Sequence, residues 1–466
     1  DPKQEDVMHK KRIAAVLATC MFAAAAGCAG NRQPSQTPTA PETTAASTEQ
    51  PTATQPITVQ PTTVPPATES KLKRVTTFSQ DAIIPYNAFS LELLRKNLKE
   101  DNSSLLVSPL SVLSALGMTA NGANGETLQE FETAFGMQAE ELNLFMAYLQ
   151  YSDADDELLQ SFENELGILT EVPVIHNANS LWLSSDRGFT AEQAFLDTAE
   201  QYYNAQVNTV PFDSKLPGQV NGWVKENTDG MIDSILDNVE PNDVAYLVNA
   251  VAFDAKWEKP YENIDVRSGT FTCEDGAAQT VKMMTGTERA KRCYLQDDNA
   301  EGFLKPYTGG RFAFAALLPD KGIRVRDYLD TLTGEKLTAI LQKANDTPVE
   351  AKIPKFEGSY DVPLNESLQT MGIQSAFDMD AADLTRLGKS DNGDNLYLNK
   401  VLHKTFISVA EQGTRAGAAT LASASGSAAP SARPRQIYLD RPFVYMLVNL
   451  KTNTPLFIGT LMAVSE

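Results

Sequence analysis

The chain has 466 residues, of which 60 are acidic and 39 are basic, so its formal net charge is −21. This charge argues against nucleic acid or an anionic lipid surface as the main partner. Hydrophobic residues make up 42% of the chain, with 20 Phe and 14 Tyr, which excludes a wholly disordered protein.

Histidine and cysteine are too scarce for the common metal and thiol sites. The only histidines are His9, His176 and His403, and the four cysteines show no CxxC spacing. We therefore expect no metal and no cofactor. Cys273 and Cys293 are expected to be a free, buried pair and not a disulfide.

The start of the chain has the pattern of a secretory signal. Basic residues follow Met8, and then an apolar run, Ile13–Ala26, is too short to span a bilayer. This run leads into Ala25-Ala26-Gly27-Cys28, which resembles the lipobox of bacterial lipoproteins, where the cysteine is lipidated. We predict a signal peptide over residues 1–28 with a lipid anchor on Cys28; signal cleavage without lipidation is the alternative.

A segment rich in proline and threonine follows the signal. Residues 31–70 contain eight Pro and eleven Thr and almost no large apolar side chain. Such a segment cannot bury enough surface to offset its ordering entropy. We predict a disordered stalk over residues 29–72 and one globular unit over 73–466. The protein is therefore expected at the cell surface, or secreted if the lipobox is not used.

The globular unit begins with helical patterns and ends with strand patterns. Helices are predicted over 82–98 and 111–118. Strands are predicted over 179–183, 246–253, 311–318, 405–410, 443–450 and 456–461. This order indicates an α+β fold with a large, mostly antiparallel sheet. Segment 443–450 is apolar on both faces, so we expect it to be a central strand.

Residues 411–440 have an unusual composition between two apolar strands. The even positions from Thr414 to Ala424 carry only small, uncharged side chains, whereas Arg415 is at an odd position. Alternate residues of a strand share a face, so this segment can insert between strands with its even face packed and Arg415 in solvent. Because Ala, Gly and Ser have low strand propensity, a flexible surface loop is the alternative.

Several motifs in chain order resemble those of the serpin family. They are Ser108-Pro109-Leu110-Ser111 with Asn121-Gly122-Ala123; NxWVxxxTxGxI over 221–232; 249–253 with Trp257 and Pro260-Tyr261; 353–356; 371–377; Glu411 to Thr420; and Arg441-Pro442-Phe443 with 456–459. The resemblance covers about residues 75–466. It implies three β-sheets, including a large central sheet A, eight or nine helices and an exposed reactive-centre loop at about 411–440.

The resemblance also implies a function, which is protease inhibition and not enzymatic catalysis. A serine protease would cut the loop and form a covalent acyl-enzyme, and the severed loop would then insert into sheet A as a new strand. The protein is expected to be a monomer, with membrane contact only through the lipid anchor. The alternatives are a non-inhibitory serpin with a binding or chaperone-like role and, less well supported, a lipid-anchored solute-binding protein.

The resemblance assigns roles to particular residues. It places Ser108, Ser111, Asn249 and His403 in a buried polar cluster, the shutter, beneath the point where sheet A opens. It places Trp257 at the breach, where the hinge of the loop would enter the sheet, although a simple core role suits this residue equally. The hinge itself is assigned to Glu411, Gly413, Thr414, Arg415, Ala416, Gly417, Ala418, Ala419 and Thr420.

The position of the reactive bond follows from counting along the loop from Glu411, as in the family. This count gives Ser427 or Ala428 as the scissile residue, and we choose the bond Ser427–Ala428, within a window of about 424–431. Only small side chains occur over 422–432. They imply a target protease with a small primary pocket, either elastase-like or subtilisin-like.

Overall fold

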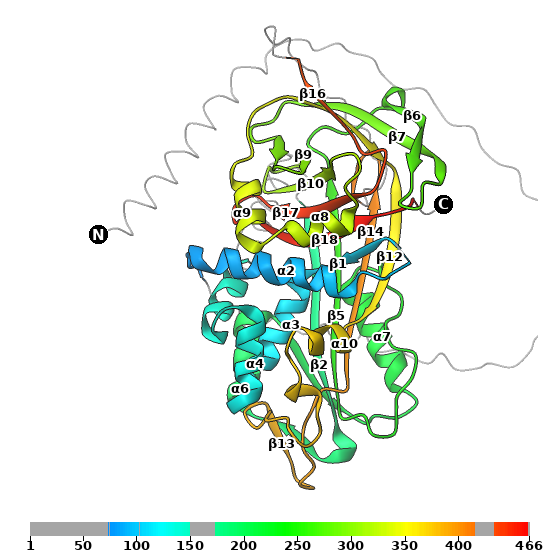
Figure 1. Cartoon of the computed structure of the whole chain (residues 1–466). Coiled ribbons are helices and arrows are strands. Elements are labelled where there is room, and N and C mark those ends of the chain that lie inside the picture. Colours follow the sequence, from blue (N-terminus) through cyan, green and yellow to red (C-terminus); the bar gives the residue numbers. More distant parts are fainter. Residues whose placement is uncertain (1–72, 74, 102, 150–172, 415–432, 465–466) are drawn as a thin grey trace, which may run out of the picture. The chain divides into compact units, whose positions relative to one another are not determined.

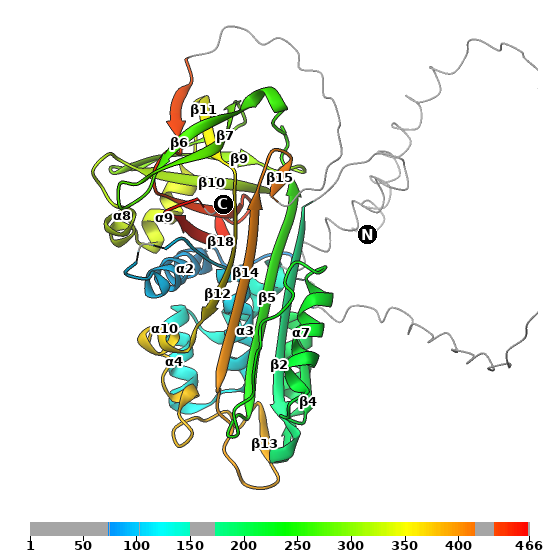
Figure 2. The same cartoon turned by 90° about the vertical axis from the view of Figure 1, so that its right-hand side faces the viewer.

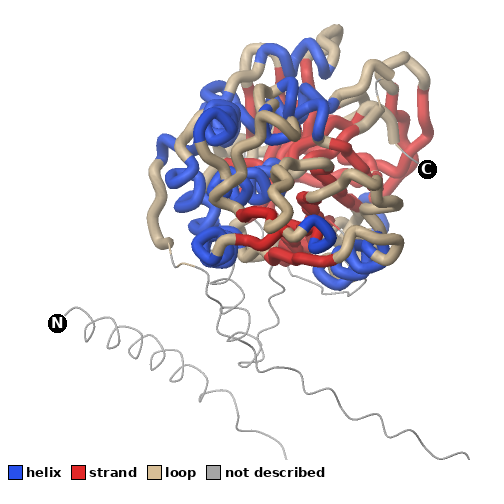
Figure 3. Tube along the Cα trace, turned by 90° about the horizontal axis from the view of Figure 1, so that it is seen from below, coloured by secondary structure: helices blue, strands red, loops and turns tan. Residues whose placement is uncertain are grey.

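Strands form the centre of the structure, and helices lie on either side of them (Figure 1 and Figure 3). The computed structural model describes residues 73, 75–101, 103–149, 173–414 and 433–464, which belong to a compact unit spanning Glu69–Glu466. The predicted signal, Cys28 and the stalk lie outside the described residues. No helix within these ranges combines the length and apolar composition that crossing a bilayer requires.

The helices pack against the sheets at several levels of the structure (Figure 1). Their bounds are α2 (Ile83–Asn97), α3 (Pro109–Gly122), α4 (Gly125–Phe135), α6 (Gln193–Tyr203), α7 (Leu216–Asn227), α8 (Val325–Thr331), α9 (Gly334–Gln342) and α10 (Asn365–Thr370), and residues 139–149 are also helical. Helix α3 begins earlier than predicted because Ser108 caps it. The Ser108 hydroxyl accepts the N–H of Ser111, and Pro109 occupies the first turn.

The main sheet contains the long strands that dominate Figure 2. Its order is β12 (Phe356–Pro363), β14 (Lys400–Val409), β15 (Gly413–Thr414), β5 (Ala245–Lys256), β2 (Val174–Ser184) and β4 (Gln206–Val210). Strands β14 and β5 pair directly and in parallel from Lys400–Tyr246 to Phe406–Ala252. We call this paired region the seam. The sheet is mostly antiparallel, as its sequence predicts, and its parallel pairs are β14–β5 and β2–β4.

Both faces of the main sheet are covered. On β5, Tyr246 and Val248 belong to the apolar cluster that includes the buried side chains of α7, whereas Leu247 and Val251 belong to the cluster that includes α3. This alternation follows from the two-residue repeat of a strand. Any strand added at the seam would therefore lie between two packed layers.

Two further large sheets lie above the long strands (Figure 1). One has the order β1 (Leu105–Val107), β18 (Thr454–Leu461), β17 (Phe443–Asn449), β10 (Phe312–Pro319), β9 (Ala300–Pro306) and β8 (Tyr294–Gln296). The other has the order β16 (Arg435–Tyr438), β11 (Val349–Pro354), β7 (Ala278–Glu288) and β6 (Val266–Thr272), and a small pair joins β13 (Gly388–Ser390) to β3 (Phe189–Ala191). The predicted α+β class with three large sheets is confirmed, and β17 is central and buried, as expected.

The two cysteines in the described part of the chain are unpaired, as predicted. Cys293 is buried, and burial raises the pKa of its thiol to about 11. Cys273 is partly exposed, so the expectation that both are buried is wrong for this residue. It directly follows β6 and lies at the start of the turn before β7.

Candidate functional site

The predicted inhibitory loop is described only at its two ends. The chain is described as far as Thr414 and again from Arg433. The predicted hinge residues 415–420 and the reactive bond Ser427–Ala428 lie outside the described residues, so these assignments remain predictions. Glu411, Gly413 and Thr414 are placed.

Strand β15 lies between the upper ends of β14 and β5 (Figure 2). Thr414 is opposite Val409 of β14 and Ala255 of β5, antiparallel to both. Gly413 suits its position because a Cβ atom there would clash with the carbonyl oxygen of Ala255. Thr414 is fully buried, with its hydroxyl 2.6 Å from the Tyr307 hydroxyl. The start of the loop therefore already occupies a strand position, with Thr414 on the inward face.

Trp257 lies beside the chain that leads into β15. Its backbone N–H donates to Gln412 O and its indole N–H donates to Ala410 O, both at 2.9 Å. The indole is 1% exposed and stacks on Tyr307, with ring centroids 4.5 Å apart. Trp257 is thus a buried aromatic that also holds the backbone on the way to the hinge, so the two readings of this residue describe the same contacts.

A buried ion pair supports the segment that follows Trp257. Lys305 Nζ lies 2.8 Å from Glu288 Oε1 and donates to Lys259 O at 3.0 Å. The ammonium also lies 4.3 Å from the centroid of the Tyr261 ring, and Tyr261 N–H donates to Glu411 O at 2.9 Å. Burial lowers the pKa of Lys305, and Glu288 opposes this effect. The pair thus fixes a segment that is bonded to the base of the loop.

Glu411 makes a second contact at the same place. Its carboxylate is 2.8 Å from Lys355 Nζ. About a quarter to a third of each side chain is exposed, so the pair contributes roughly 1 kcal/mol or less. It orients the base of the loop more than it stabilises the fold.

The four predicted shutter residues lie together under the seam. Ser108 N–H donates to His403 Nε2 at 3.1 Å, and His403 Nδ1 is 2.9 Å from Asn249 Oδ1. Because Nε2 accepts a hydrogen bond, the ring hydrogen belongs on Nδ1 and points to Asn249. The Ser111 hydroxyl also donates to Asn249 Oδ1, and Asn249 Nδ2 donates to Ser111 O at 2.7 Å.

This cluster joins the two strands of the seam to α3. His403 on β14 and Asn249 on β5 are register partners. Asn249 Nδ2 also donates to Asn179 Oδ1 on β2, a contact that the sequence analysis missed. Burial lowers the pKa of His403 to about 3, so the imidazole is neutral at ordinary pH. A strand that entered the seam would have to separate His403 from Asn249.

Other contacts near the base of the loop were also missed from sequence. Lys305 lies on β9, Tyr307 lies just after it and Glu288 ends β7, all outside the motifs that carry the resemblance. A lysine within the apolar strand β9 is a signal that could have identified Lys305, since a buried lysine requires a partner. Within the described ranges, no group of three or more His, Cys, Asp or Glu side chains is arranged to hold a metal ion.

Comparison with known proteins agrees with this arrangement. A family profile described as Serpin (serine protease inhibitor) matches residues 85–464. Human Serpin B3 is 29% identical over 384 residues, covering 80% of this chain and 96% of its own. The crystal structure of a thermophilic serpin, tengpin, in its native state is 39% identical with a TM-score of 0.73, covering 84% of this chain and 96% of its own. The same protein in its latent state is 36% identical with a TM-score of 0.68, covering 84% and 100%.

Proposed function

The chain belongs to the serpin family, whose members are generally protease inhibitors, and we propose that it is a suicide-substrate inhibitor of serine proteases with a small primary pocket. The protease serine attacks the carbonyl carbon of Ser427, and the bond to Ala428 breaks. The amine of Ala428 is the leaving group and takes up the proton of the serine hydroxyl, and an ester joins the protease to Ser427. Residues 428–466 stay associated through β16, β17 and β18. The new end of the loop then inserts into the seam before water hydrolyses this ester.

The observation that carries this proposal is the position of β15. Gly413 and Thr414 already separate the upper ends of β14 and β5, whereas the strands below are paired with each other. Continuing both antiparallel registers would place Thr420 level with His403 and Asn249. These two residues are partners across the seam, so the registers on the two sides agree. The seam can therefore accept a strand without a shift in register.

Insertion also improves the hydrogen bonding of the sheet. The parallel ladder between Lys400–Phe406 and Tyr246–Ala252 would be replaced by two antiparallel ladders, one on each side of the new strand. The same registers would place Arg415 level with Asp254 on β5, where opposite charges stabilise a cross-strand pair. The intact protein is thus proposed to be trapped kinetically above the inserted state.

The target class follows from the loop sequence. Residues 422–432 are Ala, Ser, Gly and Pro only, and these side chains fit a shallow primary pocket. Trypsin could cut after Arg415 or Arg435, but neither cut would leave an acylated strand of the right length. The bond after Arg433 is a poor site because Pro434 follows it.

The test is to incubate the full chain with pancreatic elastase, subtilisin or trypsin and to separate the products on a denaturing gel. We expect an SDS-stable adduct with elastase or subtilisin and only cleavage with trypsin. Mass spectrometry of the denatured products should show a separate fragment that begins at Ala428. Each protease with its active serine blocked beforehand is the control. Simple nicking by all three enzymes would overturn the proposal.

We further propose that export and anchoring use the first residues, with the lipid on Cys28 and residues 29–72 as the stalk. Serpins are often extracellular, and the signal-like pattern of residues 1–28 supports this location. We also propose that this protein has two long-lived folded states. The relative that has been crystallised in a native and a latent state motivates this part of the proposal.

A further inference from the structure

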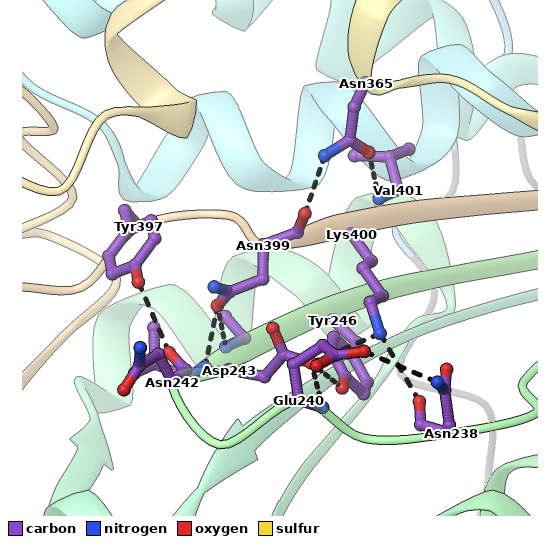
Figure 4. A network of polar contacts seen from close by, with 12 residues as sticks. Asn238, Glu240, Asn242, Asp243, Tyr246, Asn365, Tyr397, Asn399, Lys400 and Val401 are labelled. Atoms are coloured by element: carbon purple, nitrogen blue, oxygen red, sulfur yellow. Dashed lines mark hydrogen bonds and ion pairs between the residues drawn. The ribbon is translucent and has the colours of Figure 1, made fainter.

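A network of polar contacts closes the lower end of the seam (Figure 4). It joins residues 397–400, at the start of β14, to residues 238–245, which lead into β5. Asn399 Oδ1 accepts the N–H groups of Val244 and Ala245 at 2.7 and 3.1 Å. Asn399 N–H donates to Ala245 O at 3.1 Å. One residue thus makes three hydrogen bonds across the seam.

Lys400 adds an ion pair at the same level. Its Nζ is 3.2 Å from Asp243 Oδ2 and 3.3 Å from Asn238 O. Asp243 is buried, and the Tyr246 hydroxyl and the Glu240 N–H also donate to its carboxylate. The carboxylate is therefore held firmly on the β5 side, and Lys400 reaches it from β14.

The β14 side is fixed by α10 (Figure 4). Asn365 Nδ2 donates to Asn399 O at 2.6 Å, and Asn365 Oδ1 accepts the N–H of Val401 at 2.9 Å. These bonds run along β14 and do not cross the seam. If β5 and β14 separate, Asn399 and Lys400 stay with β14, and their bonds to residues 238–245 break.

The strand register shows which residues of the inserting loop reach the level of Asn399 and Lys400. Counting on from Thr414 along both antiparallel registers places Ser423 level with Lys400 and Tyr246, and Ala424 level with Asn399 and Ala245. An intervening strand moves its neighbours apart by about 4.8 Å. The Asn399 hydrogen bonds do not survive such a displacement.

We propose that Asn399 and Lys400 form a basal latch that holds the seam shut until the last residues of the loop arrive. This inference rests on the proposed loop insertion. The shutter opens first, when Thr420 reaches its level, and the latch opens about three residues later. Asn399 and Lys400 are thus positioning residues for the final step, which carries the acylated protease to the lower end of the sheet.

The latch makes a prediction that an ordinary structural contact does not. Its contacts exist only while β5 and β14 are neighbours, so they stabilise the intact protein and are absent once the loop has inserted. Removing them should weaken the intact form alone. It should also speed spontaneous loss of inhibitory activity, because the activation barrier to loop insertion becomes lower.

The experiment compares melting midpoints of intact and loop-nicked protein at one scan rate for wild type, Asn399→Ala and a control. The control is Glu130→Ala, because Glu130 also accepts two consecutive backbone N–H groups, those of Gln374 and Ser375, but its hydrogen bonds do not join β5 to β14. We expect Asn399→Ala to lower the midpoint of the intact form by roughly 3 °C and to leave the nicked form unchanged. Glu130→Ala should lower both forms alike.

Lys400→Met tests the same latch through the ion pair and should give the same pattern if Asn399→Ala does not fold. Equal losses in the intact and nicked forms of both latch variants would overturn the latch. If nicking does not raise the midpoint of wild type, loop insertion itself fails, which is a separate result. A several-fold faster loss of inhibitory activity in either latch variant on warming would support the latch independently.

Discussion

His403 is a titratable side chain in a fully buried site that suits only its neutral form. Its ring is fully buried, Nε2 accepts from Ser108 N–H, and Nδ1 faces Asn249 Oδ1. A second proton would go on Nε2, which would then point a donor at another donor. Burial disfavours the charged imidazolium and lowers the pKa of His403 to about 3. The predicted shutter therefore contains a neutral imidazole.

A pH dependence follows from this shift. The histidine titrates near 6.5 in the unfolded chain and near 3 in the folded protein, so the unfolded chain binds more protons between these values. Stability is then full above about pH 6.5 and falls as the pH drops through the window, by about 2 kcal/mol at about pH 5. Denaturant unfolding of wild type and His403→Gln at about pH 7.5 and pH 5 measures this change.

The glutamine variant keeps a polar side chain of similar size and has no titration in this range. We expect it to be less stable than wild type at about pH 7.5 and to lose this difference towards pH 5. An identical pH dependence in the two proteins would show that His403 does not titrate with folding. The other histidines are present in both proteins, so their contribution cancels.

At the scale of elements, β15 is a short strand whose surroundings leave room only for small side chains. Thr414 is packed between β14 and β5 and shares a hydrogen bond with Tyr307. Its neighbour Gly413 has no room for a side chain. The first step of the proposed insertion therefore depends on small residues, and any large side chain on the inward face would have to be accommodated before the rest of the loop could follow.

Replacing Thr414 by arginine should convert the inhibitor into a substrate. A guanidinium at this position would be buried without a partner, which costs several kcal/mol, so the hinge would stay out of the sheet. The protease would still cut the loop, but hydrolysis of the ester would precede insertion. Denaturing gels should show cleaved Thr414→Arg protein and little adduct with the enzyme that traps wild type.

Thr414→Ser is the matched control, since it keeps the hydroxyl and the small size and should form the adduct normally. Adduct formation by the arginine variant in wild-type yield would contradict the role given to β15. A lower melting temperature of the intact arginine variant is compatible with the role given to β15, because Thr414 already lies between β14 and β5 in the intact form.

The sequence predicted these elements to different degrees. Strands such as 443–450 and 246–253 were identifiable because runs of apolar residues are buried on both faces. The shutter residues could be named only through the family resemblance, since Ser108, Asn249 and His403 are far apart in sequence and no local pattern brings them together. Lys305 and Asn399 were missed because a single lysine or asparagine acquires its meaning from partners that only the tertiary structure supplies.

For the whole molecule, the proposed insertion gives one sheet two arrangements. The seam is parallel and directly paired, but its upper end is already opened by β15. The breach contacts, the shutter and the basal latch lie in order from the top to the bottom of the same seam. In the proposed insertion each opens in turn, so the barrier would be distributed along the sheet and would not depend on one contact.

Such a molecule should inactivate slowly without any protease. When the chain is warmed below its melting temperature, we expect inhibitory activity to decay with first-order kinetics, because the uncut loop can enter the seam in a single molecule. The half-life should be independent of protein concentration, which distinguishes this process from polymerisation.

The inactive product should remain monomeric by size-exclusion chromatography, resist nicking of the loop and melt at a higher temperature than the active form. Activity loss that follows second-order kinetics, or an inactive monomer whose melting temperature is unchanged, would show that the seam does not accept the intact loop.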